Sequence, residues 1–558
     1  MRKLELDKIK RYLKNKKIIF AAWNVERKDD NPYQNWYLPL KDLFGETIIF
    51  DTAKNYFRYG KILMNKKLLN LVEKEKPDYV FFLIIYDEID ILALQEIKKK
   101  NPRIITLNMF TDDDWRYEDF SRFYSLFIDY PIVNITDVDM KSPYIKDGIK
   151  KLSLSFGMNC QLFRPIKIKK RYDVSFVGRP NKNRVSLVKF LLDNNIDINV
   201  WGDGWENYPQ IMKAYRGRLP AEDLVKVTNE SKINLGFTIG GYNKLQIKGR
   251  VLEIAACKSF CLLEYFSAYL KYFKEEKELV MFKNKNDLMK KIKYFLKNEK
   301  YREKIATAAY EKTIRFYNKS LELLDYFKDI KKFEKNLMGK NLPSVIGVVE
   351  NISLDDIKRG DEFLRNKISE ADYIIFEKTG NKIDHPFRNY LQQYSLEKSG
   401  KEISCCDYYV SSKDLGNYLL FKARVAFATL KKKDFDSCLK IEQIMTTKQY
   451  FLNNLNKFKF ALNQGKFELI NDKNTTYLSI PLVSIEKAPT LNYEVFKKAF
   501  QMKFLDNLYS LYYQNKIFSS KYLYRLIFSS IFYNRFLLRI IRENLSDKKK
   551  VFKLKKGI

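Results

Sequence analysis

Histidine is almost absent from this chain, since His385 is the only one among 558 residues. A histidine-based metal centre is therefore excluded, and the residues before position 385 must supply any general base from other side chains. The six cysteines show no paired metal-binding spacing, so we expect reduced, mostly buried thiols and a cytoplasmic location. No run of about 18 apolar residues occurs, so neither a membrane span nor a signal peptide is expected.

Acidic residues are outnumbered by basic ones, with 68 Asp and Glu against 103 Lys and Arg and a formal charge of +35. Such a field attracts polyanions, so a non-catalytic basic scaffold that binds RNA or an anionic membrane is one hypothesis. Lys is abundant together with Asn, Ile, Phe and Tyr, however, a bias typical of an AT-rich coding background that scatters lysines over solvated faces. No module for single-stranded nucleic acid is visible, and no specific nucleic acid is expected.

Short apolar segments alternate with amphipathic ones along the first half of the chain. This alternation is typical of parallel sheets joined by crossover helices. The strands predicted for a first domain are residues 17–23, 47–51, 78–85, 103–110 and 131–137, and those for a second are 172–178, 197–202, 232–238, 260–265 and 278–282. The predicted fold class is α/β, with two Rossmann-like domains facing a cleft at the carboxyl ends of their strands.

The segment "LQIKGRVLEIAACKSFCLLEYF" (residues 245–266) places two cations at the start of a predicted helix. Lys248, Gly249 and Arg250 stand where the helix dipole already presents positive charge and free N–H groups. Such a start suits a bound anion such as phosphate; a solvated first turn is the alternative. Glu253, about one turn further on, can accept two hydrogen bonds from vicinal hydroxyls such as those of a ribose.

Two strand ends in the second domain carry further candidates. In "SFVGRPNKNR", Gly178 allows close backbone approach, and Arg179 can make paired hydrogen bonds to phosphate oxygens. In "VWGDGW", Trp201 and Gly202 could hold a nucleobase against an aromatic wall, although a Trp beside a Gly is also typical of ordinary packing. These four residues are candidate donor contacts.

Five motifs of the second domain occur in one order: "YDVSFVGRPNKNR", "INVWGDGW", "SKINLGFT", "QIKGRVLEIAACKSFCLLEYF" and "LKYFKEEKELVMFKNKNDLMKKIKYFL". In this order they resemble the CgeB-like (spore maturation protein) branch of the GT-B glycosyltransferases. In the first domain, "NMFTDDDWRYEDFSRFY" resembles the same branch. The resemblance spans residues 17–318.

The resemblance implies that the second domain binds a nucleotide diphosphate sugar and that the acceptor enters from the first domain. It places Glu253 on the ribose, and Lys248, Arg250 and Arg179 at the diphosphate. The misplaced cations and the glutamate would then be two halves of one site. Many GT-B enzymes carry a second glutamate where this chain has Leu245, so no catalytic role is transferred to that position.

A cluster of three carboxylates provides the best general-base candidate. Asp112, Asp113 and Asp114 follow the strand predicted at 103–110, at its carboxyl end. Asp113, the central one, is preferred for deprotonating an acceptor hydroxyl. The alternative is that the cluster caps the following helix, and a retaining enzyme would need no such base.

A third region resembles a family 2 glycosyltransferase of GT-A fold. Strands are predicted in "LPSVIGVVE" and "ADYIIF", but Lys378, Thr379 and Gly380 stand where that family carries an Asp-x-Asp metal motif. The resemblance therefore implies a degenerate, non-catalytic module that lacks the carboxylates for a divalent cation. An unrelated α/β domain is the alternative.

The C-terminal segment predicts a basic amphipathic helix followed by a Lys-rich tail. Four arginines share one sector of the helical wheel, opposite an apolar surface: Arg525, Arg535, Arg539 and Arg542. This pattern suits peripheral attachment to the inner face of the cytoplasmic membrane. A helix packed on the third domain, with its arginines in water, is the alternative.

The predicted organisation has four parts. They are a Rossmann-like acceptor domain at 1–165, a Rossmann-like donor domain at 166–335, a degenerate GT-A-like domain at 336–515 and a helical tail at 516–558. The predicted function is transfer of a sugar from a nucleotide diphosphate sugar to a hydroxyl of a bacterial surface glycan, glycolipid or protein. Neither a metal nor a cofactor is expected besides the donor, and the basic scaffold is the competing hypothesis.

Overall fold

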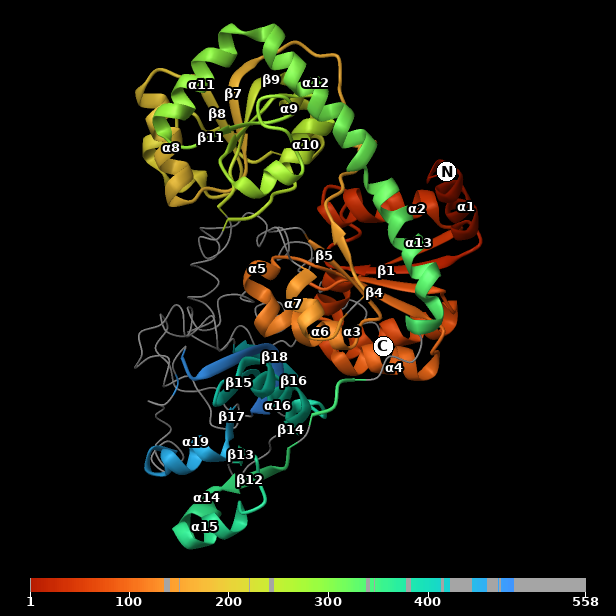
Figure 1. The fold of residues 1–558 in the computed structure, drawn as a ribbon, viewed down its shortest axis with the longest axis vertical. Helices are drawn as coiled ribbons and strands as arrows, with labels where there is room; N and C mark the ends of the chain where they lie inside the picture. Colours follow the sequence, from red (N-terminus) through yellow and green to blue (C-terminus); the bar gives the residue numbers. More distant parts are fainter. Residues whose placement is uncertain are drawn as a thin grey trace, which may run out of the picture. The chain divides into compact units, whose positions relative to one another are not determined.

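The computed structural model describes residues 2–134, 141–149, 151–219, 221–239, 245–337, 342–345, 347–377, 383–412, 416–421, 444–458, 470 and 473–485. Contacts divide the chain into two units. The first is made of Met1–Tyr56, Lys61–Tyr117 and Ser121–Leu342, and the second of Phe57–Gly60, Glu118–Phe120 and Pro343–Ile558. The first unit contains two separate sheets, and the second contains another (Figure 1).

The first sheet is six-stranded and parallel, in the order β2-β1-β3-β4-β5-β6. We call this sheet and its helices the first lobe. Its strands are β1 (Lys17–Ala22), β2 (Glu46–Asp51), β3 (Tyr79–Leu83), β4 (Ile105–Phe110), β5 (Tyr130–Asn134) and β6 (Ser153–Ser155). Its helices are α1 (Arg2–Leu13), α2 (Leu38–Leu43), α3 (Thr52–Glu75), α4 (Ile91–Lys100), α5 (Asp113–Arg116), α6 (Arg122–Leu126), α7 (Lys141–Lys146) and the π-helical η1 (Pro32–Tyr37) and η2 (Tyr117–Ser121). Every residue of β3 and β4 is buried, as expected for central strands of a sheet that is covered on both faces.

The second sheet, with its helices, forms the second lobe and is five-stranded and parallel, in the order β11-β10-β9-β7-β8. Its strands are β7 (Tyr172–Val177), β8 (Ile198–Trp201), β9 (Ser231–Gly236), β10 (Cys261–Glu264) and β11 (Val280–Phe282). Its helices are α8 (Lys182–Asp193), α9 (Ala221–Glu230), α10 (Arg250–Ala256), α11 (Lys285–Lys297), α12 (Glu299–Phe316) and the 3-10 segments η3 (Trp205–Asn207), η4 (Pro209–Ile211) and η6 (Ser267–Lys271). All the strands predicted for the two domains are present, whereas the short β6 is not among the predictions. The predicted α/β class, with two Rossmann-like parallel sheets, is confirmed.

Helix α13 (Lys319–Leu337) returns from the second lobe to the first, where it lies beside α1 and α2 (Figure 1). Phe327 and Ile330 are buried in the core of the first sheet. The ring of Phe327 lies 4.9 Å from that of Phe44 and 5.1 Å from that of Tyr79. The donor domain predicted at 166–335 therefore includes a helix whose core contacts belong to the first lobe, while the domain boundaries themselves stay predictions.

The second unit is built on a mixed sheet in the order β12-β13-β17-β15-β18-β14, with β16 paired to β15. The strands are β12 (Val349–Ser353), β13 (Tyr373–Glu377), β14 (Ile383–Asp384), β15 (Ile403–Ser412), β16 (Gly416–Phe421), β17 (Ile444–Thr447) and β18 (Thr475–Ile485). The helices are α14 (Leu354–Lys358), α15 (Asp361–Lys367), α16 (Arg388–Ser399) and α19 (Lys448–Asn453). The pairs β12–β13 and β15–β18 are parallel, and the other pairs are antiparallel. Lys378, Thr379 and Gly380 lie outside the described residues, and the GT-A resemblance stays a prediction.

The predicted amphipathic tail at 516–558 also lies outside the described residues. Among the helices that the structure describes, none is long and apolar enough to cross a membrane. Peripheral attachment through the tail therefore stays a prediction.

Candidate functional site

Two glycines bring the ends of β7 and β8 into close backbone contact. The amide of Gly178 donates to the carbonyl of Trp201 at 2.9 Å. A Cβ on Gly202 would lie 2.5 Å from the carbonyl oxygen of Gly178, and the φ of Gly202, 136°, is one that other residues rarely adopt. Both glycines are predicted donor contacts, but the structure explains them by the packing of these strand ends.

Trp201, the predicted aromatic wall, is buried. It is 4% exposed, and its ring packs edge-on against Tyr172 with the centroids 5.1 Å apart. The neighbouring Trp205 is fully buried and donates its indole N–H to the carbonyl of Gly178 at 2.7 Å. Trp201 therefore offers little surface for a nucleobase in this structure.

An arginine in the first turn of α8 lies at the same strand ends. Arg184 donates from Nη1 to the carbonyl of Arg179 at 2.7 Å and from Nη2 to the carbonyl of Ile239 at 3.3 Å. Its guanidinium lies 5.3 and 5.6 Å from the ring centroids of Phe176 and Phe237. Its Nε is buried and has no hydrogen-bond partner among the described residues, and the side chain of Arg179 is exposed. One predicted and one unpredicted arginine thus meet at this edge.

Glu264, the last residue of β10, completes this edge. Its Oε1 accepts from Nδ2 of Asn183 at 3.0 Å, and its Oε2 accepts from the backbone N–H and the hydroxyl of Thr238 at 3.0 and 3.2 Å. Burial lowers the pKa of Arg184, and the charge of Glu264 acts in the opposite direction. The sequence reasoning missed Arg184 and Glu264, although an acidic residue that ends an apolar strand is a usable signal for the carboxyl edge of a parallel sheet.

Arg250 and Glu253, the two halves of the predicted site, form an ion pair. Nη1 of Arg250 lies 3.0 Å from Oε2 of Glu253, and the two side chains are 14% and 17% exposed. Nη2 of Arg250 also donates to the hydroxyl of Thr228 at 3.0 Å. Nε of Arg250 is buried and has no hydrogen-bond partner among the described residues. The cation at the start of α10 is therefore compensated by the helix's own first turn.

Lys248, the other predicted cation at the start of α10, belongs to a series of hydrogen bonds that reaches the first lobe. Nζ of Lys248 donates to Oε1 of Gln246, whose Nε2 lies 3.4 Å from Oδ1 of Asp112. The backbone N–H of Lys248 donates to the hydroxyl of Tyr269 at 2.6 Å. Among the described residues, no hydrogen bond or ion pair joins Arg179 to this series of hydrogen bonds or to the Arg250–Glu253 pair. The predicted donor contacts thus form separate groups.

Asp113, the preferred one of the three predicted carboxylates, is buried. It is 4% exposed and accepts hydrogen bonds from the hydroxyls of Ser121 and Tyr144 at 2.5 and 2.6 Å. Burial raises its pKa to about 6. Asp112 is half-buried with φ 59° and is the residue bonded to the second lobe, and the side chain of Asp114 is not described. Asp112 thus lies at the contact with the second lobe, whereas Asp113 is enclosed, and the choice of general base among them stays a prediction.

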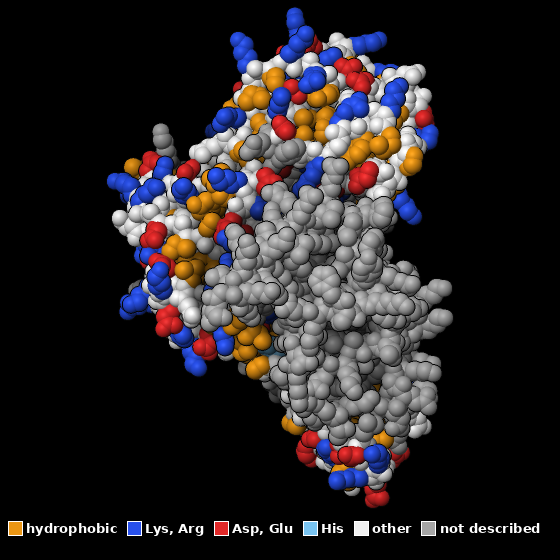
Figure 2. Space-filling view, turned by 180° about the vertical axis from the view of Figure 1, so that it is seen from behind, with side chains coloured by type: hydrophobic (Ala, Val, Ile, Leu, Met, Phe, Trp, Pro, Cys, Tyr) orange, Lys and Arg blue, Asp and Glu red, His pale blue; other side chains and the backbone are white. Residues whose placement is uncertain are grey.

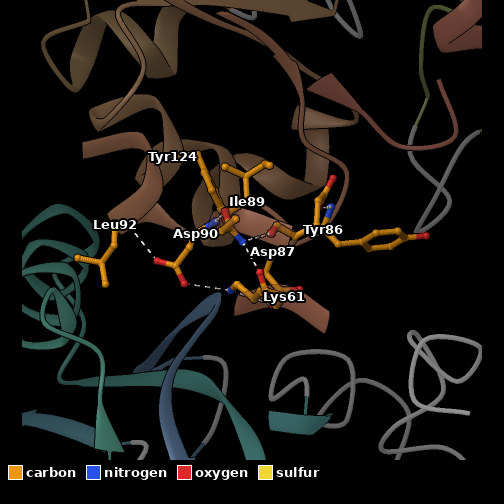
Figure 3. Close-up of polar contacts among 9 residues, drawn as sticks. Lys61, Tyr86, Asp87, Ile89, Asp90, Leu92 and Tyr124 are labelled. Atoms are coloured by element: carbon orange, nitrogen blue, oxygen red, sulfur yellow. Dashed lines mark hydrogen bonds and ion pairs between the residues drawn. The ribbon is translucent and has the colours of Figure 1, made fainter. Parts of the chain in front are cut away.

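A buried charged cluster, unpredicted from the sequence, fixes the loop after β3. Figure 3 shows Lys61, from α3, pointing toward Asp87 and Asp90, with its Nζ 3.4 and 3.6 Å from their carboxylate oxygens. The hydroxyl of Tyr124 donates to the carbonyl of Ile89 at 2.9 Å. Burial lowers the pKa of Lys61, while the charge of Asp90 acts to raise it. The cluster attaches the loop to its neighbouring helices.

Glu88 holds the same loop from inside. It is fully buried, and its carboxylate accepts from the backbone N–H groups of Ile85 and Tyr86 at 3.0 and 2.7 Å. Burial raises its pKa, and these backbone hydrogen bonds act to lower it. Glu88 therefore shapes the loop and is not an accessible base.

A cavity of about 310 Å³ lies between the two lobes. It is lined by apolar and neutral polar side chains and by one lysine; the lining includes Asn35, Trp36, Ile85 and Thr111 from the first lobe, Ile247, Gly249 and Leu252 from the second, and Met158 and Lys319 where the lobes join. Of the predicted donor contacts, Gly249 lines this cavity.

The second lobe carries the decisive sequence match. Residues 183–320 match the family model described as Glycosyl transferase-like. The match runs from the first turn of α8 to the start of α13 and includes Arg184, Glu253 and Glu264. The prediction of an enzyme of the glycosyltransferase class is confirmed by this domain. No curated protein matches the sequence.

Three solved structures are similar to the chain at low identity. A glycosyltransferase from Rickettsia africae is 12% identical, covers 59% of this chain and 100% of its own, and gives a TM-score of 0.42. A sucrose-phosphate synthase from Thermosynechococcus elongatus is 10% identical, covers 57% and 100%, and gives 0.42. Anabaena HepE in complex with UDP and glucose is 10% identical, covers 58% and 100%, and gives 0.40.

Charged side chains are dispersed over the described surface. On the face shown in Figure 2, Lys and Arg side chains alternate with Asp, Glu and apolar ones. This agrees with the predicted scattering of lysines. Within the described part of the chain, no group of three or more His, Cys, Asp or Glu side chains could hold a metal ion. Metal independence of the reaction stays a prediction.

Proposed function

We propose that the chain is a CgeB-like GT-B glycosyltransferase that moves a sugar from a nucleotide diphosphate donor to an acceptor hydroxyl. One observation carries the proposal: the Glycosyl transferase-like match covers the second lobe from α8 onward, where Arg184 and Arg250 lie, and Arg179 precedes it at the end of β7. Guanidinium groups make strong, charge-assisted hydrogen bonds to phosphate oxygens. This lobe is therefore the proposed donor site.

The arginines also supply the chemistry that the departing group needs. Breaking the sugar–phosphate bond leaves negative charge on the nucleoside diphosphate, which preorganised positive groups stabilise. Arg184 and Arg250 each keep a buried Nε–H that no described residue uses. Glu253, already held by Arg250, is the proposed acceptor of the ribose hydroxyl hydrogen bonds. No metal is required in this scheme.

Asp112 is the proposed general base if the enzyme inverts configuration. Its carboxylate would take the proton of the acceptor hydroxyl as that oxygen attacks the sugar carbon, while Gln246 orients the carboxylate from the second lobe. In a retaining enzyme this base is unnecessary. The proposed acceptor is a bacterial surface glycan, glycolipid or protein. We propose that the third region docks this acceptor. The tail is proposed to attach peripherally to the membrane on its cytoplasmic side.

Thermal unfolding with a panel of nucleotide sugars tests the proposal. UDP-glucose, GDP-mannose, ADP-glucose and dTDP-glucose are compared with inorganic phosphate and with single-stranded RNA. A ligand that binds only the folded chain stabilises it by about 2.7 kcal/mol at 100 times its Kd. We expect one nucleotide sugar to raise the unfolding temperature. Stabilisation by RNA alone would favour the basic scaffold instead.

A further inference from the structure

Two stretches of chain connect the lobes, and they are hydrogen-bonded to each other. Met158, on the way from β6 to β7, donates its backbone N–H to the carbonyl of Tyr317 at 2.8 Å. The backbone N–H of Lys319, at the start of α13, donates to the carbonyl of Met158 at 2.9 Å. Met158 and Asn318 form a parallel β-bridge. Rotation of one lobe against the other must therefore bend this paired segment.

The carboxylate of Glu322 is bound directly to this segment. It accepts from the backbone N–H of Phe156 at 2.5 Å and from the hydroxyl of Ser155 at 3.3 Å, and it pairs with the ammonium of Lys319. A Cβ on Gly157 would lie 2.7 Å from Oε2 of Glu322. A side chain at position 157 would therefore displace the carboxylate of Glu322.

Lys319 connects the same carboxylate with the cavity. Its side chain is 2% exposed, and the residue lines the cavity between the lobes. Its Nζ lies 4.0 Å from the ring centroid of Trp36 and donates to the hydroxyl of Ser155 at 3.0 Å. A buried ion pair of this kind is costly to break on one side, because the remaining charge is left uncompensated. The pair with Glu322 therefore holds the junction in one arrangement.

We propose that Lys319 and Glu322 are a positioning pair that fixes the angle between the lobes, and that a ligand in the cavity acts on this angle through Lys319. The proposal rests on the proposed function for the identity of that ligand, a nucleotide sugar. Transfer requires donor and acceptor, held by different lobes, to meet at reaction distance. The Lys319–Glu322 pair contacts both the cavity and the junction. It therefore links the occupancy of the cavity to the distance between donor and acceptor.

Hydrogen exchange of the full chain without ligand tests the junction. In Glu322→Gln, the amide of Phe156 is expected to exchange about tenfold faster or more, since its hydrogen bond to a charged group is weakened. The amides of β3 and β9 should exchange as in the wild type. The matched control is Asp325→Asn, which alters the half-buried pair with Lys328 on the same helix and should change nothing at the junction. Equal exchange at Phe156 in Glu322→Gln and the wild type overturns the proposal.

A second variant keeps the test valid if Glu322→Gln fails to fold. Gly157→Ala adds a single carbon against the same carboxylate and leaves both charges in place. Faster exchange at Phe156 is expected, with a smaller change than in Glu322→Gln. An unchanged rate in a folded Gly157→Ala protein contradicts the role of the carboxylate.

Coupling to the cavity is tested with the same panel of four nucleotide sugars. A sugar nucleotide that binds should slow exchange at Phe156 in the wild type but not in Lys319→Met, while exchange near Arg184 slows in both. If Lys319 has a purely structural role, the nucleotide sugar will slow exchange at Phe156 equally in both proteins, and this result overturns the coupling between cavity and junction. Donor binding near Arg184 without any effect at Phe156 overturns it as well. If no nucleotide sugar binds the wild type, the proposed function and the ligand coupling fail together, whereas the ligand-free exchange still decides the junction.

Discussion

The two lobes are both parallel α/β sheets, yet the charged side chains near the carboxyl ends of their strands are used differently. In the first lobe, Asp113 and Glu88 are buried acids whose oxygens accept hydrogen bonds from hydroxyls and backbone N–H groups. In the second lobe, Arg184 and Arg250 are basic, and each keeps an Nε–H unused by the described residues. A shared fold therefore positions the edge of the sheet, whereas the side chains that follow the strands decide what that edge can bind.

Charged side chains that are enclosed by hydrogen-bond donors also differ from those that can still bind a ligand. A buried carboxylate is tolerated when donors surround it, and then little capacity remains for a ligand. This describes Asp113 and Glu88 in the first lobe. Asp112 is the exception there, since it is half-buried and contacts Gln246 of the second lobe.

The largest effect is expected from Asp112→Asn, which removes the proposed base from the first lobe. If the enzyme inverts configuration, the turnover number should fall by about 10²- to 10⁴-fold, because an amide cannot accept the acceptor's proton. Steady-state transfer rates measured beside Asp113→Asn check this. An equal loss in both variants would contradict the distinction between the two carboxylates.

Arg250→Ala should weaken nucleotide-sugar binding by about 100-fold, since charge-assisted hydrogen bonds to phosphate are lost. Glu253→Ala is expected to act in the same direction through the loss of ribose contacts. Titration calorimetry with the donor that stabilises the wild type provides the measurement. Arg103→Ala, at an exposed arginine of the first lobe, is the control. Unchanged affinity in both site variants would remove this site.

Asp113 should make the free energy of unfolding depend on pH. Its pKa is about 6 in the folded chain against 3.8 ordinarily, so the folded state holds more protons between these values. Stability is therefore expected to fall as pH rises through this window, by roughly 3 kcal/mol, and to stay level above it. Denaturant unfolding between about pH 4 and pH 8 should show a flatter profile in Asp113→Asn. The same slope in both proteins would be inconsistent with the raised pKa.

The smallest effect is expected from removal of divalent cations. Because arginines are proposed to stabilise the departing diphosphate, transfer should continue in excess EDTA. Transfer rates with and without the chelator provide the measurement. Mg²⁺ added in excess after the chelator then tests whether a divalent cation changes the rate. Loss of activity that Mg²⁺ or Mn²⁺ restores would contradict the metal-free scheme.

The sequence predicted the elements that depend on local pattern. Apolar runs such as 17–23 and 172–178 form strands because burial of both faces of a parallel sheet requires them. The first-turn proximity of Arg250 and Glu253 also follows from helical spacing, since residues three apart share a face. The assignment of the second lobe to a glycosyltransferase domain rested on motif order along the chain.

Tertiary structure decided how these charges are used. Sequence spacing treats Asp112 and Asp113 alike, but packing encloses Asp113 with Ser121 and Tyr144 and leaves Asp112 at the contact with the second lobe. Trp201 is similarly withdrawn from the edge by its packing on Tyr172.

The junction of the lobes likewise depends on contacts between distant residues. Glu322 meets Phe156 across 166 positions of the chain, so neither periodicity nor a local motif could indicate the contact. The sequence by itself thus determined two α/β lobes and their order, because strand and helix patterns are local. Only the folded structure determined which carboxylates are enclosed and which side chains hold the lobes together, because burial and ion pairing depend on residues brought together from different parts of the chain.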